Sequence, residues 1–205
     1  MIKVIRVFSS VLVFFSIIFL GYCYFTGQGI FSARTKNTIS TKTIDIGGHF
    51  SLTNHNGNLV HTSDFTNKYM LVFFGFSSCK RICPMHLGII SEALTKLDQK
   101  LNEKLQVLFV TVDPKRDSVE KLRDFQQQFD SRIIMLTGDK DEIDKIALKY
   151  KVYVSNTANN EEINHSSIIY LISPNGEYVT HFSLDIDSSE DQAQKLSEGI
   201  EHYLR

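Results

Sequence analysis

Residues 69–90, YMLVFFGFSSCKRICPMHLGII, decide the fold because two kinds of pattern meet in them at a pair of cysteines. Residues 69–75 form a continuous apolar run, which is typical of a strand buried on both faces of a sheet. From Pro84 onward, apolar residues recur at steps of three and four, as on one face of a helix. Cys79 and Cys83 lie at the junction. The stretch therefore predicts a strand, a cysteine loop and a helix that has Pro84 in its first turn.

The patterns that follow repeat this alternation of strand and helix. Residues 105–112 predict a second buried strand and residues 132–136 a third, with helical patterns between and after them. A strand, a helix and a strand in this order imply a parallel pair with a right-handed crossover. Asn56-Gly57 and the segment 173–176 predict hairpin turns. We therefore expect an α/β chain with a thioredoxin-like fold, a central mixed sheet flanked by helices, and an N-terminal transmembrane anchor.

The sequence also makes three local predictions. The helical pattern from Pro84 extends to Leu101 and predicts one helix. Asp117 is expected to cap the next helix. Residues 155–164, SNTANNEEIN, are expected to form a polar loop.

The N-terminal segment differs in kind from the rest of the chain. Residues 7–25 carry no charge, and at about 1.5 Å per residue they nearly cross a hydrocarbon core of ~30 Å. Lys3 and Arg6 precede the run, which favours a cytoplasmic or matrix-side N-terminus. A cleaved signal peptide is the alternative, but small residues that would mark a cleavage site are lacking. We favour an uncleaved anchor.

These patterns divide the chain into three parts. Residues 1–31 are expected to form the membrane anchor with its short cytoplasmic or matrix-side start, residues 32–46 a polar stalk, and residues 47–205 the thioredoxin-like domain. The domain would then be membrane-anchored and lie in a periplasm or a mitochondrial intermembrane space. No acidic or basic tract points to a nucleic-acid partner, and the net charge is only −1.

The two cysteines of the exported domain have three interpretations. An even pair in an oxidising compartment is usually a structural disulfide. A position at a strand end, next to the amides of a helix start, instead favours thiolates, which are nucleophiles and soft metal ligands. Three residues separate Cys79 from Cys83, whereas thioredoxin-type enzymes have two. A redox pair and one half of a metal site both remain open.

A metal site needs a third ligand, and two histidines are candidates. His86 would share a helical stripe with Cys79 and Cys83. His165 would face the cysteines if the strand that follows it runs antiparallel beside residues 69–75. Two thiolates and an imidazole suit Cu(I), and the same set could hold zinc with a water. The remaining histidines are expected to be solvated side chains: His49, His55, His61, His181 and His202.

Three separated motifs resemble the Sco/SenC family of membrane-anchored copper chaperones for cytochrome c oxidase assembly. They are GFSSCKRICP, TVDPKRDS and NHSSIIYLISPNGEY, and the resemblance runs from about Gly48 to Tyr203. It implies one copper ion per domain, bound by Cys79, Cys83 and His165.

The resemblance also implies a function for that site. Copper would be delivered to the binuclear copper centre of cytochrome c oxidase subunit II, so the partner would be that subunit or its assembly factors. Such a protein is a metallochaperone rather than an enzyme. The alternative is a thiol–disulfide oxidoreductase in which Cys79 and Cys83 are the redox-active pair acting on the cysteines of an exported partner.

The chain departs from many family members near these ligands. Lys80 and Arg81 make the cysteine loop basic where many relatives have an acidic residue, and Asn164 stands where many have Asp before the histidine. A lost carboxylate beside an imidazole ligand weakens its orientation or basicity. The family pattern also places Asp113 near the site, although a turn before Pro114 would explain it equally well.

Overall fold

The structure, a computed structural model, describes residues 14–22, 46–156, 163–165, 167–185 and 191–205; for residues 155–156 and 163–165 the description covers the backbone. The chain divides into two units, residues 1–42 and residues 43–205, and each is described by itself.

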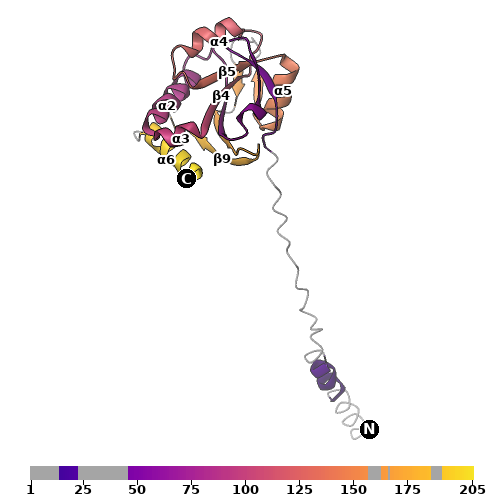
Figure 1. The fold of residues 1–205 in the computed structure, drawn as a ribbon. Coiled ribbons are helices and arrows are strands. Elements are labelled where there is room, and N and C mark those ends of the chain that lie inside the picture. The colour runs from indigo at the N-terminus through magenta and orange to yellow at the C-terminus, as the bar shows by residue number, and fades with distance from the viewer. Residues whose placement is uncertain (1–13, 23–45, 157–162, 166, 186–190) are drawn as a thin grey trace. The chain divides into compact units, whose positions relative to one another are not determined.

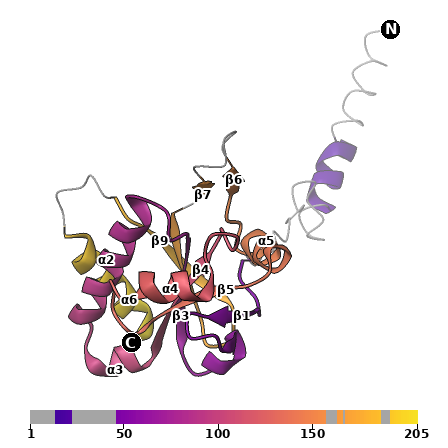
Figure 2. The ribbon, with the colours of Figure 1, turned by 90° about the horizontal axis from the view of Figure 1, so that it is seen from above.

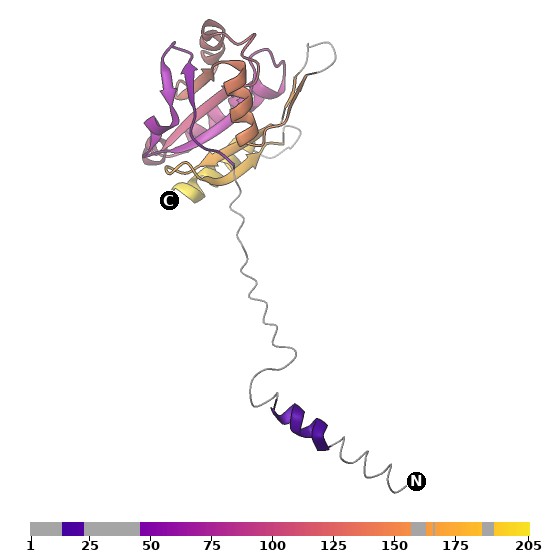
Figure 3. The same cartoon turned by 90° about the vertical axis from the view of Figure 1, so that its right-hand side faces the viewer.

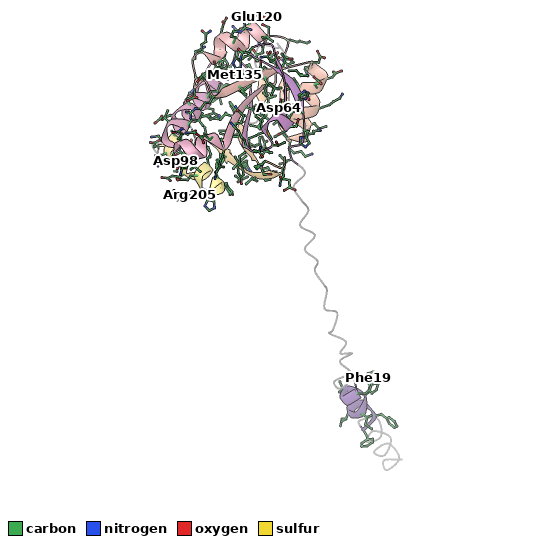
Figure 4. The ribbon with its side chains drawn as sticks, in the orientation of Figure 1. Phe19, Asp64, Asp98, Glu120, Met135 and Arg205 are labelled. Atoms are coloured by element: carbon green, nitrogen blue, oxygen red, sulfur yellow. The ribbon has the colours of Figure 1, made fainter. Side chains whose placement is uncertain are left out.

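In the first unit, residues 14–22 form a helix whose side chains are exposed, including Phe19, which is labelled in Figure 4. The predicted span 7–25 reaches beyond the described residues at both ends. Within the described ranges, no helix combines the length and the apolar character needed to cross a bilayer.

The second unit is built on a seven-stranded mixed sheet with the strand order β2-β1-β5-β4-β3-β8-β9, and a two-stranded sheet joins β6 to β7. The strands are β1 (Ser51–Asn54), β2 (Leu59–His61), β3 (Tyr69–Gly75), β4 (Leu105–Thr111), β5 (Ile133–Thr137), β6 (Val154–Asn156), β7 (Ile163–His165), β8 (Ile168–Ile172) and β9 (Tyr178–Ser183). The helices are η1 (Thr62–Phe65), α2 (Ile82–Lys96), α3 (Gln99–Glu103), α4 (Val119–Gln126), α5 (Lys140–Lys149) and α6 (Gln192–Leu204).

The pairing of the central strands follows from their sequences. β3, β4 and β5 are parallel neighbours, as the alternation of strands and helices predicts. Six of the seven residues in β3 are buried, and so are six of the seven in β4, because helices cover both faces. β8 runs antiparallel to β3 with Phe73 opposite Ile169, so the start of β8 lies beside the end of β3.

Helices cover the sheet on both sides. In Figure 1, α2, α3 and α6 lie on one side of the central strands and α5 lies on the other. Figure 3 shows α5 in orange in front of the strands, and the β6–β7 hairpin stands apart from the larger sheet in Figure 2. α2 and α6 also pack against each other. Met135 of β5 is fully buried within this layered core, where Figure 4 labels it.

The fold confirms the thioredoxin-like expectation and both predicted hairpin turns. Gly57, with φ +85°, lies between β1 and β2, and Gly176, with φ +80°, lies between β8 and β9. Glycine adopts these left-handed angles without the steric cost that a side chain brings.

Three local expectations were wrong. The helix from Pro84 does not continue to Leu101: α2 ends at Lys96, and Asp98 caps the separate helix α3. The segment after α5 is not simply a polar loop, because β6 and β7 pair antiparallel on either side of residues 157–162, which lie outside the described residues. The cap of α4 is Ser118, whose side chain accepts a hydrogen bond from the Lys121 amide, and not Asp117.

Candidate metal centre

The two cysteines lie at the carboxyl end of the central strand. β3 ends at Gly75, a short loop carries Cys79, and α2 begins at Ile82 with Cys83 in its first turn. The Val112 amide donates to the Gly75 carbonyl at 2.8 Å, so the end of β4 lies beside this loop. In open α/β sheets this edge is where ligands bind.

The last residue of β3 must be glycine because the cysteine packs directly against it. A Cβ on Gly75 would lie 2.9 Å from the Cys83 Sγ and 2.7 Å from the Phe109 ring. Both neighbours are fully buried, so neither has free space into which it could move. The sulfur of Cys83 is therefore seated against the strand backbone.

The Cys79 sulfur accepts hydrogen bonds from the start of α2. The Cys83 amide donates to the Cys79 Sγ at 3.4 Å. A hydrogen bond from the Cys83 thiol, together with the backbone amides of Cys83, Arg81 and Ile82, outweighs partial burial and lowers the pKa of Cys79 to about 5. Cys79 is therefore a thiolate at neutral pH, and its side chain is partly exposed.

Cys83 has the opposite character. It is fully buried, and the hydrogen bond with Cys79 and burial both raise its pKa, to which the nearby Asp117 carboxylate adds. Cys79 and Cys83 are not joined by a disulfide. The pair thus consists of one accessible thiolate and one buried thiol that share a proton, which is a strongly coupled arrangement.

A buried carboxylate supports the loop from the β4 side. Asp117 is fully buried and accepts hydrogen bonds from the Ser77 amide at 3.0 Å and the Ser77 hydroxyl at 2.5 Å. The Thr111 hydroxyl donates to the same carboxylate at 2.6 Å. The sequence suggests only a helix cap here; the position of Asp117 six residues after the end of β4, at the ligand-binding edge, is the signal that could have identified this role.

Asp113 lies near the same edge of the sheet, but its carboxylate is engaged in an ion pair. It is mostly buried and forms an ion pair with Arg116, whose guanidinium carbon is 5.8 Å from the centre of the Phe76 ring. The Asp113 backbone carbonyl accepts a hydrogen bond from the Asp117 amide, so Asp113 forms the turn that the sequence also predicts for it.

The structure disfavours His86 as a ligand. Cys79 precedes α2, so the helical stripe expected for Cys79, Cys83 and His86 does not form. The His86 side chain is buried, with its ring centre 5.5 Å from that of Phe73 in the core. Across the described side chains, which include all three of these residues, no group of three His, Cys, Asp or Glu could hold a metal ion.

His165 is located by its backbone. It ends β7, pairs with Val154 of β6, and precedes the start of β8 by three residues. Since Ile169 of β8 lies opposite Phe73 of β3, the chain just before β8 approaches the end of β3 that leads to the cysteines. The strand that follows His165 runs antiparallel to β3 as expected, while His165 itself belongs to the separate β6–β7 hairpin.

The remaining five histidines lie elsewhere in the sequence, outside the cysteine loop and α2. His49, His61, His181 and His202 are exposed, as expected. His55 was expected to be solvated but is partly buried, and its Nδ1 accepts a hydrogen bond from the Met135 amide at 3.2 Å. Burial lowers the pKa of His55, which keeps the ring neutral.

The fold and this site define a class: thioredoxin-like proteins that carry a dithiol pair at the carboxyl end of a central parallel strand. The family model described as SCO1/SenC matches residues 39–202. The chain belongs to the SCO1/SenC family.

Relatives support this assignment in sequence and in structure. The SCO2-like protein of Rickettsia prowazekii is 39% identical over 152 residues, which are 72% of this chain and 74% of that protein. The human mitochondrial SCO1 homologue is 33% identical over 142 residues, which are 67% of this chain and 47% of that protein. The structure of Bradyrhizobium japonicum ScoI with copper bound has a TM-score of 0.68 at 30% identity and covers 77% of this chain and 99% of that one.

Proposed function

We propose that this protein binds one copper ion through Cys79, Cys83 and His165 and delivers it to the binuclear copper centre of cytochrome c oxidase subunit II. The observation that carries the proposal is the thiolate–thiol pair at the carboxyl end of β3. Thiolate sulfur is a soft ligand that favours Cu(I), and an imidazole completes a common low-coordinate set.

The architecture around the pair supports the choice of His165. The antiparallel register of β3 and β8 brings the segment that precedes β8 to the strand end that carries the cysteines. A ligand contributed by the segment that leads into β8 can complete a site that the two cysteines alone cannot. The copper-bound relative supports copper over zinc.

Family membership supports the choice of partner. A further relative is described as a member of the Sco family of cytochrome c oxidase assembly proteins. The partner is then subunit II or its assembly factors, and the copper ion is cargo rather than a resident cofactor.

The proposed location follows from the same partner. In this proposal, residues 1–31 would anchor the chain through the apolar span 7–25, residues 32–46 would be a stalk, and residues 47–205 would be the copper-binding domain. This domain would lie in the periplasm or the mitochondrial intermembrane space, as the mitochondrial relative suggests.

The experiment is a transfer assay. The full chain in mild detergent is loaded with one equivalent of Cu(I) and mixed with the metal-free copper-binding domain of subunit II. We expect copper to leave the chain and appear in that domain, and Cys79→Ser or Cys83→Ser to prevent loading. A chain that loads copper but retains it in the presence of the metal-free domain would refute delivery while leaving binding intact.

The asymmetry of the two sulfurs favours a second candidate, thiol–disulfide exchange. The accessible Cys79 thiolate would attack a partner disulfide, form a mixed disulfide and release one partner thiol. Cys83 would lose its proton and attack the Cys79 sulfur, releasing the second partner thiol and leaving a Cys79–Cys83 disulfide. The partner gains the two electrons that the pair loses.

The two candidates are distinguished with metal-free protein. If exchange is the function, Cys83→Ser should accumulate a mixed disulfide with a disulfide-bonded subunit II domain, and Cys79→Ser should not. Absence of any reduction by the metal-free parent would exclude this candidate.

A further inference from the structure

The carboxylate of Asp117 is the most completely buried charged group near the cysteine loop. It has no exposed surface, and its oxygens accept three hydrogen bonds, from the Ser77 amide, the Ser77 hydroxyl and the Thr111 hydroxyl. Burying a charge is costly unless hydrogen bonds compensate for it. Two of the three compensating donors belong to one residue of the cysteine loop.

Asp117 joins the ends of the three parallel strands. Ser77 follows β3, Thr111 ends β4, and Thr137 at the end of β5 donates to the Asp117 backbone carbonyl at 2.9 Å. Asp117 therefore connects the cysteine loop to the ends of β4 and β5. The connection to β5 uses the backbone, whereas the connection to the cysteine loop uses the carboxylate.

The path from this carboxylate to the sulfur is short. Ser77 precedes Cys79 by two residues, and the Cys79 amide donates to the Phe76 carbonyl at 3.2 Å, which closes a tight turn. Bonding both the amide and the hydroxyl of Ser77 fixes the start of this turn. On the far side of the turn, the Cys83 amide contacts the Cys79 sulfur.

We propose that Asp117 is a positioning residue that fixes the Cys79 sulfur relative to Cys83 through its paired hydrogen bonds to Ser77. The helix cap, which would be a purely structural role, is filled by Ser118. The copper-binding part of the inference rests on the proposed function, while the placement of the two sulfurs does not.

The test compares four variants of the full chain in mild detergent. Asp117→Asn replaces the carboxylate by a neutral amide. Ser77→Ala removes the hydroxyl that donates to Asp117 and leaves the Thr111 hydroxyl bonded to the carboxylate. Thr137→Val is the matched control, since it removes a buried hydrogen bond to the backbone of the same residue. Asp124→Asn makes the same charge change at an exposed site on α4.

Two quantities are measured on each folded variant. The first is Cu(I) affinity by competition with a chromophoric chelator. We expect it to fall about 10-fold in Ser77→Ala and up to about 100-fold in Asp117→Asn, as for other residues that orient metal ligands.

The second quantity is the equilibrium constant for forming the Cys79–Cys83 disulfide against glutathione disulfide, in which two glutathione thiols are released. We expect it to fall about threefold or more because the two sulfurs lose their fixed approach. Thr137→Val and Asp124→Asn should match the parent in both.

Each outcome decides the inference. Parent-like values in Ser77→Ala and Asp117→Asn would overturn it, and so would an equal loss in Thr137→Val, which would indicate a merely structural effect. If Asp117→Asn does not fold, Ser77→Ala decides. If the parent itself binds no Cu(I), the proposed function fails, and the glutathione equilibrium alone tests whether Asp117 positions the pair.

Discussion

Replacing Gly75 by alanine should disturb the dithiol pair directly, because the Cys83 sulfur is packed against this glycine. The added Cβ would lie 2.7 Å from the Phe109 ring and 2.9 Å from the Cys83 Sγ. Carbon atoms in favourable contact are about 3.5–4.0 Å apart, so about 1 Å must be relieved at the ring. Both neighbours are fully buried, and the strand pairs with β4 and β8 on its two edges.

The expected cost follows from this overpacking. Inserting a methyl group into a well-packed core destabilises a protein by about 1–3 kcal/mol. We expect the added methyl group to displace the Cys83 side chain, because it is smaller than the Phe109 ring. Copper affinity should then fall as well. The assay is urea unfolding of reduced, metal-free residues 43–205, which form one compact unit, followed by a Cu(I) competition titration.

Gly88→Ala is the matched control for this substitution. Gly88 lies in the same segment, on the exposed side of α2, and a Cβ there would meet nothing within 4 Å. Alanine in a helix is favoured over glycine by about 1 kcal/mol, so this variant should be slightly stabilised and bind copper normally. If Gly75→Ala behaved like Gly88→Ala in both measurements, the close packing of Cys83 against β3 would be refuted.

Two further results are expected of the metal-free protein. Because a thiol with a lowered pKa is a thiolate above that pKa, alkylation of Cys79 by iodoacetamide should be nearly constant at neutral pH and decline as the pH falls through about 5. Cys83→Ser should move the midpoint, since it replaces the thiol that donates to Cys79, and a parent midpoint near the ordinary value of about 8.5 would contradict the hydrogen-bonded thiolate. Tyr150→Phe should be neutral or stabilising by up to about 1 kcal/mol in urea unfolding, because the fully buried hydroxyl has no hydrogen-bond partner among the described residues. A loss of more than about 2 kcal/mol would instead reveal a hydrogen bond at that hydroxyl.

The sequence predicts the layered fold well because its strands are long and apolar. The run 69–75 and the run 105–112 match β3 and β4 closely, since strands buried on both faces must be apolar throughout. The helix that starts near Pro84 was also predicted, but not its end. The apolar spacing continues through Leu97 to Leu101, whereas the Asp98 side chain caps a new helix, and a cap is a local hydrogen bond that periodicity does not report.

The candidate site was predictable only in part. The cysteine pair is visible from its spacing and its place between strand and helix. The role of Asp117 was missed because its partners Ser77 and Thr111 come from other strand ends, and only the folded sheet brings them together. The β6–β7 pairing was missed for a related reason, since its two strands have three residues each and flank a polar segment.

The central claim is that the imidazole of His165, and not that of His86, binds copper together with the sulfurs of Cys79 and Cys83. The most direct measurement is the copper stoichiometry and Cu(I) affinity of His165→Ala compared with His86→Leu, with the parent chain as reference. We expect one copper per chain in the parent, an affinity at least about tenfold weaker in His165→Ala, and near-parent binding in His86→Leu, whose side chain fills the core position. Unchanged binding in His165→Ala, together with a loss in His86→Leu, would contradict the account.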